Sequence, residues 1–164
     1  SDTGAEPFPV RARTFLLPAV PLMSEMTPEE RLTLTRRTMA LLEDWGLGAR
    51  DILTILSLPE SVKVRAVARF REDEPFPDDP AVNRRVAYLI RIEEALHPYF
   101  PRNPEMRSMW VKRGNRQYGK RAPIAVMVEG GENGLVSVLS HLDCTFAWDQ
   151  TGSKTEYARL QSVD

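Results

Sequence analysis

The chain has 164 residues, a length that fits one domain or two small helical domains sharing a core. Charged residues make up 27% and the formal net charge is -1, so attraction to nucleic acid or to acidic partners must be local. One cysteine, Cys144, excludes an internal disulfide framework, and no apolar run approaches the ~18 residues that span a bilayer. We therefore expect a cytoplasmic protein without a membrane segment.

The two ends of the chain are predicted to lie apart from the helical body. Residues 1–26 carry prolines that exclude a long helix or a central strand, namely Pro7, Pro9, Pro18 and Pro21. The apolar side chains between them predict an extended arm that packs on this chain or on a second copy. Residues 149–164 are polar and lack an apolar stripe, which predicts a mobile tail or a segment ordered by a partner.

The first predicted helix begins directly after the arm. Thr27 can cap it, Pro28 suits the first helical position, and the two glutamates that follow favour the positive end of the helix dipole. Apolar residues then recur at steps of three and four as far as Trp45, and Gly46 ends the helix.

Two short helices are predicted next, from about Ala49 to Leu56 and from Pro59 to Phe70, joined by only two residues. A long helix followed by such a pair is the outline of a helix-turn-helix unit. The second helix of the pair carries basic side chains that could reach phosphates and base edges, and we predict DNA contacts at Lys63, Arg65 and Arg69. The alternative is a basic helix face that is simply solvated.

A long helix is predicted after an acidic, proline-broken loop. Asp79 can cap this helix, Pro80 can open it, and an apolar stripe extends to about Phe100. Because Pro98 falls in the last turn, we expect the helix to end or kink there. A further short helix is expected from about Pro104 to Val111, followed by a loop.

Two clusters could carry chemistry, and both are weak. Glu93, Glu94 and His97 resemble half of a di-metal site, but no second copy of the motif occurs in the sequence. His141 and Cys144 could be imagined as base and nucleophile, but no residue is placed to orient them. We therefore predict no enzymatic activity, no metal and no cofactor.

The most basic segment of the chain runs from residue 102 to residue 121. It holds seven basic residues against one acid, Glu105, so its local balance is seven minus one, or +6. Trp110 and Tyr118 lie among these charges, an arrangement that suits phosphate contacts with base stacking or docking onto an acidic protein surface. The alternative is a solvated loop with Trp110 in the core.

The last third of the chain is predicted to hold two more helices. Pro123 can open the first, and the sequence EGGENG should stop it. The second carries the most regular apolar stripe of the chain, at positions i, i+3, i+4 and i+7, formed by Leu135, Val138, Leu139 and Leu142. The pattern as a whole predicts an all-α protein.

The order of these C-terminal features resembles the toxin-binding domain of the Xre/MbcA/ParS antitoxin family. The resemblance is carried by Trp110, Asn115, Gly119, Pro123, Ile124, Met127, Gly130, Gly134, Leu135, Val138 and Leu142. Residues 31–100 resemble the helix-turn-helix that precedes this domain, so about two-thirds of the chain is covered. Two positions depart from the family pattern: Ala122 replaces the Thr or Ser that can cap a helix, and Ser57 replaces the turn glycine.

The resemblance implies a helix-turn-helix-like bundle over residues 27–100 and a toxin-binding domain over residues 101–148. It further implies a homodimer that neutralises a RES-domain toxin, a class that consumes NAD, and that binds its own promoter. The implied toxin contacts are Arg121, Gly134, Leu135, Val138 and Leu142. The implied structural motif of the toxin-binding domain is Trp110, Asn115, Gly119 and Pro123.

Two alternatives to this interpretation stay open. The chain could be a stand-alone helix-turn-helix regulator without a toxin partner. The stripe of the last helix could also be core, with only the glycine-rich turn exposed.

Overall fold

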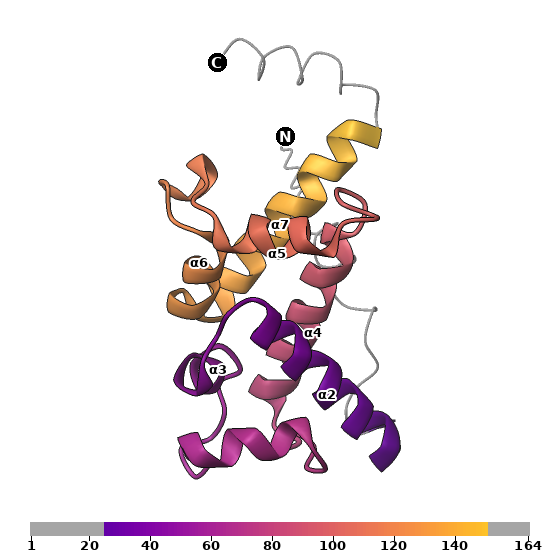
Figure 1. The fold of residues 1–164 in the computed structure, drawn as a ribbon, viewed down its shortest axis with the longest axis vertical. Helices are drawn as coiled ribbons and strands as arrows, with labels where there is room; N and C mark the ends of the chain where they lie inside the picture. Colours follow the sequence, from indigo (N-terminus) through magenta and orange to yellow (C-terminus); the bar gives the residue numbers. More distant parts are fainter. Residues whose placement is uncertain (1–24, 151–164) are drawn as a thin grey trace, which may run out of the picture.

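The computed structural model describes the backbone of residues 25–150 and the side chains of residues 25–143. All regular elements in this range are helices, which confirms the all-α prediction (Figure 1). In chain order they are α2 (Pro28–Asp44), α3 (Ala49–Ile55), η2 (Val64–Arg71), α4 (Pro80–Leu96), α5 (Pro104–Lys112), η3 (Arg116–Tyr118), α6 (Pro123–Glu129) and α7 (Gly131–Gln150). The predicted arm and tail lie almost entirely outside the described residues, although α7 extends to Gln150.

Three helices begin where the sequence places a capping side chain. The Thr27 hydroxyl accepts from the Glu30 amide at 3.1 Å while the Glu30 carboxylate accepts from the Thr27 amide at 2.8 Å, a complete capping box before α2. Asp79 accepts from two amides at the start of α4, and Asn103 accepts from the Met106 amide before α5. A proline opens each of these helices, because its fixed φ and missing N–H cost nothing there.

The second short helix of the predicted pair differs from expectation. Residues 59–62 form only a turn, Lys63 is extended, and the helix that follows is the 3₁₀ helix η2 (Val64–Arg71). Val62 and Val64 are β-branched and flank this break, and their restricted χ1 angles disfavour a continuous α-helix through it. The prediction of one helix from Pro59 to Phe70 was therefore wrong in its start and in its type.

The glycine-rich sequence ends one helix and opens the next. α6 ends at Glu129 as expected, and α7 begins at Gly131, so Glu132 to Gly134 belong to its first turn. Gly131 has a φ of 64° and supplies the left-handed residue that redirects the chain between the two helices. α4 ends at Leu96, before Pro98, in agreement with the expected effect of that proline.

One hydrophobic core extends across the predicted domain boundary at residue 100. Its buried side chains run from Leu34 on α2 to Leu142 on α7 and form a single cluster. The most extensive contacts join α4 to α7 and α6 to α7, and α3 also packs against α6. α4 also packs against α2, which crosses it in the view of Figure 1. The segments 27–100 and 101–148 therefore share their core, and α4 is its central element.

Candidate functional site

The connection between α5 and α6 is a tightly bonded turn that the sequence marks with Asn115 and Gly119. The Asn115 amide donates to the Arg121 carbonyl at 3.0 Å, and the Lys120 amide donates to the Asn115 carbonyl at 2.9 Å. The Asn115 side chain accepts from the Gln117 amide at 2.8 Å and caps η3. Gly119 ends η3 with a φ of 63°, a conformation that glycine adopts without steric cost. Both motif residues therefore shape the backbone of this turn, which we call the basic turn (residues 113–121).

Trp110 precedes the basic turn in the sequence and Pro123 follows it. Pro123 is buried and occupies the first turn of α6, whereas Ala122 at the N-cap makes no side-chain hydrogen bond. The departure at Ala122 thus leaves α6 without the cap that Thr or Ser would supply. Trp110 is half-buried and packs against the core without being one of its buried members.

Gly134 is a packing residue at the crossing of α6 and α7. A Cβ atom built on Gly134 would lie 2.1 Å from the carbonyl oxygen of Val126, and one on Gly130 would lie 2.6 Å from the same atom. Real Cβ atoms do not approach a backbone oxygen so closely, so only glycine lets the two helices meet here. Gly134 is also buried, so the packing of α6 against α7 is enough to explain why this position needs glycine.

The apolar stripe of α7 faces the core of the protein. Leu135 and Val138 are each 0% exposed and Leu142 is 3% exposed. As folded, these three predicted toxin contacts are covered by this chain's own helices, which is the arrangement that the core alternative describes. They lie on the inward face of α7, whereas Asn133 and Ser137 lie on its exposed face.

Arg121 is the one predicted toxin contact that is fully at the surface. Its guanidinium lies 2.6 Å from the Glu129 carboxylate, and its side chain is 50% exposed. An exposed pair of this kind adds little to stability and can be exchanged for other carboxylates. Arg121 and Glu129 thus place an exposed charged pair at the two ends of α6.

A contact that the sequence did not indicate joins Tyr118 to His141 on α7. The two rings pack edge to face with centroids 5.8 Å apart. Burial raises the pKa of Tyr118 to about 12 and lowers the pKa of His141. The pairing connects the basic turn to α7 across residues far apart in sequence, so no local pattern could have revealed it.

The predicted DNA contacts lie at the surface around η2. Lys63, Arg65 and Arg69 are all exposed, and Arg69 lies 4.0 Å from the Glu74 carboxylate. η2 packs against α2 and α3, so a three-element cluster exists, but its last member is a 3₁₀ helix. Ser57, between α3 and η2, has a φ of 55° and takes the left-handed conformation that the turn requires.

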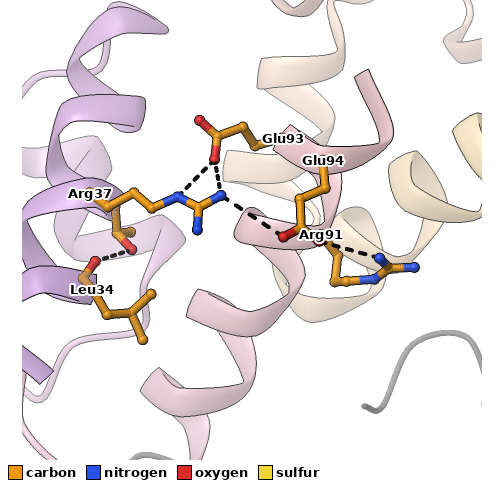
Figure 2. A network of polar contacts seen from close by, with 6 residues as sticks. Leu34, Arg37, Arg91, Glu93 and Glu94 are labelled. Atoms are coloured by element: carbon orange, nitrogen blue, oxygen red, sulfur yellow. Dashed lines mark hydrogen bonds and ion pairs between the residues drawn. The ribbon is translucent and has the colours of Figure 1, made fainter. Parts of the chain in front are cut away.

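The carboxylates considered for a metal are held by arginine. Both the Nε and the Nη2 atoms of Arg37 on α2 donate to Glu93, at 3.1 and 2.7 Å, and Glu94 is paired with Arg91 at 3.3 Å (Figure 2). His97 is exposed at the end of α4. Among residues 25–143 no group of three metal-binding side chains occurs, and the side chain of Cys144 lies outside that range.

Comparison with models of known protein families gives no match for this sequence, and comparison with curated proteins gives none either. Within the described range, no helix has both the length and the apolar character needed to cross a membrane.

Proposed function

We propose that this chain is an antitoxin that binds and neutralises a partner toxin of the RES-domain type through its C-terminal helices. The observation that carries the proposal is the role of the residues that resemble the family pattern. Asn115 and Gly119 shape one turn, Pro123 opens the next helix, and Gly134 permits one helix crossing. These residues all lie between the N-cap of η3 and the first turn of α7, as the members of a single domain motif would.

The proposed toxin contacts are the exposed residues of this unit. Arg121, Asn133 and Ser137 are accessible, whereas Leu135, Val138 and Leu142 hold α7 in place from beneath. Arg121 would exchange Glu129 for a carboxylate of the partner. The antitoxin is proposed to act as a cytoplasmic homodimer and without a cofactor.

Co-expression with the product of the neighbouring gene tests the proposal. That product should arrest growth alone and should be neutralised by this chain. The variants Arg121→Glu and Ser137→Arg should weaken neutralisation, whereas Arg50→Glu, at an exposed position of α3, should not. A neighbouring product that is harmless alone, or that is not rescued by this chain, contradicts the proposal.

A second candidate function is promoter binding through η2. It is favoured by Lys63 and Arg65, which are exposed and have no ion-pair partner among the residues described. Replacing Arg65 and Arg69 with Ala should weaken binding to the upstream promoter in a mobility-shift titration and leave toxin neutralisation intact. Wild-type binding should fall steeply as salt rises, because phosphate contacts release counterions. Loss of both activities together would assign these arginines a structural role.

A further inference from the structure

Among residues 25–143, two large apolar side chains are strongly exposed: Val64 at 43% and Met109 at 41%. Met109, on α5, stands at the edge of a hollow of about 190 Å³ that is also lined by Phe100, Met106 and Trp110. A dry cavity of about 150 Å³ holds a benzene-sized group, so this hollow has room for one aromatic or branched apolar side chain. We call it the Trp110 pocket.

The lining of the Trp110 pocket suits a protein side chain. Two of its members are methionines, whose flexible and polarizable thioethers adapt to apolar groups of different shape. Phe100 and Trp110 are both half-buried in the wall of the pocket, so neither ring is fully open to solvent. A single-stranded nucleic acid requires exposed ring faces on which bases stack, and this geometry therefore favours a protein ligand over nucleic acid.

The rim of the Trp110 pocket is positively charged. Arg113, Gly114 and Asn115 complete its lining, so the basic turn borders it directly. Arg113 and Lys120 are exposed, and neither is ion-paired with any of the residues described. The Asn115 amide donates to the Arg121 carbonyl, and the Lys120 amide donates to the Asn115 carbonyl. The backbone of Lys120 therefore lies next to Asn115, which lines the pocket. An apolar hollow beside unpaired cations is complementary to an apolar residue flanked by carboxylates.

The backbone that carries these charges is held by hydrogen bonds within the chain itself. A Cβ atom on Gly114 would lie 2.6 Å from the Lys120 carbonyl oxygen, so the two arms of the turn are in close backbone contact at this position. The Asn115 side chain closes the same turn by accepting from the Gln117 amide. A partner that binds this surface would not have to order the basic turn, and less affinity would be lost to conformational entropy.

From these observations we propose that the Trp110 pocket and the basic turn together form a docking site for an acidic protein segment that inserts one apolar anchor residue. The anchor fills the hollow beside Met109, and the flanking carboxylates pair with Arg113 and Lys120. The proposal does not depend on the toxin assignment, because it uses only the pocket and the charges around it.

Selection from a random peptide display library on the full chain tests this site. The selected peptides should be rich in Asp and Glu around a single Phe, Trp, Leu or Met. A fluorescein-labelled copy of a selected peptide should bind about tenfold or more weakly to Met109→Ser and to Arg113→Glu. Its affinity should also fall as salt rises, because the charges at the rim are exposed to solvent.

Matched controls come from the surface around the other exposed apolar side chain, Val64. Val64→Ser and Lys63→Glu change one apolar and one basic residue that line a different hollow, between α3 and η2, and should leave peptide binding unchanged. Unchanged circular dichroism spectra would show that all four variants are folded.

Recovery of no binding peptide, recovery of peptides without acids or without an anchor, or full binding by Met109→Ser would overturn the proposal. A labelled thymidine oligonucleotide that binds more tightly than the peptides and requires Arg113 would overturn it in favour of nucleic acid.

Discussion

Ser57 is held in a conformation that suits glycine better than serine. Its φ of 55° lies in the left-handed region, which costs a residue with a Cβ atom roughly 1 kcal/mol. The sequence showed only that a turn glycine was replaced, and the structure shows that the turn itself is kept. The unusual backbone angle at Ser57 is therefore local strain that substitution can relieve.

Replacing Ser57 with Gly should stabilise the protein by up to about 1 kcal/mol, because strain relief exceeds the added entropy of the unfolded chain. This should raise the melting temperature by roughly 2–4 °C. Ser57→Val should lower it, since a β-branched side chain tolerates the left-handed region poorly. Ser61→Gly, at a nearby serine with negative φ, is the control and should give no gain. A melting temperature for Ser57→Gly at or below that of Ser61→Gly would contradict the prediction.

His141 should make the folded state sensitive to acid. Burial lowers its pKa in the folded protein below the ordinary value of 6.5, so the unfolded chain binds the proton more readily. The stability contribution is therefore complete above about pH 6.5 and is lost as the pH falls through the folded-state pKa. Urea unfolding at several pH values should show this loss in the wild type and a smaller loss in His141→Gln. His97→Gln, at an exposed position, should retain the wild-type slope.

At the scale of elements, the crossing of α6 and α7 depends on the absence of side chains. Replacing Gly134 with Ala places a methyl group against the Val126 carbonyl and should destabilise the protein by about 1–3 kcal/mol, although alanine favours helices. Gly48→Ala is the matched control, because its Cβ would meet no atom within 4 Å. Chemical denaturation of the two variants measures the difference. Equal midpoints would show that the two helices can move apart at no cost.

The elements that the sequence predicted are those with local signals. Capping residues and N-terminal prolines fixed the starts of α2, α4 and α5, and the stripe of α7 was recognised by its spacing. The 3₁₀ helix η2 and the burial of Gly134 were not predictable, because both depend on what packs against the segment. For the same reason the spacing of the apolar residues on α7 did not show whether they face the core or a binding partner.

At the scale of the whole molecule, α4 links the segments that the sequence suggested as separate domains. It packs on α2 and most extensively on α7, and Arg85 on α4 also donates to the Ile55 carbonyl of α3 at 3.1 Å. Tyr99, just beyond α4, donates to the Leu142 carbonyl of α7 at 2.8 Å. Each segment therefore covers part of the apolar surface of the other.

We therefore expect the described region to unfold in one cooperative transition. Far-UV circular dichroism and tryptophan fluorescence should give coincident urea curves, since Trp45 and Trp110 report from opposite sides of the boundary. A fragment beginning at residue 101 should lack stable structure, because α7 loses the helix that covers its stripe. Two separated transitions, or a folded fragment, would show that the boundary at residue 100 divides independent units.

The shared core around α4 also bears on how long the protein persists in a cell. A protease needs an unfolded stretch, and the most protected parts of a core become accessible only when the whole core opens. Any ligand that binds the folded chain, at η2 or at the C-terminal helices, lowers the population of that open state. Occupancy at one end of the core would thereby lengthen the half-life of its other end as well, so that partner supply and protein turnover become linked quantities.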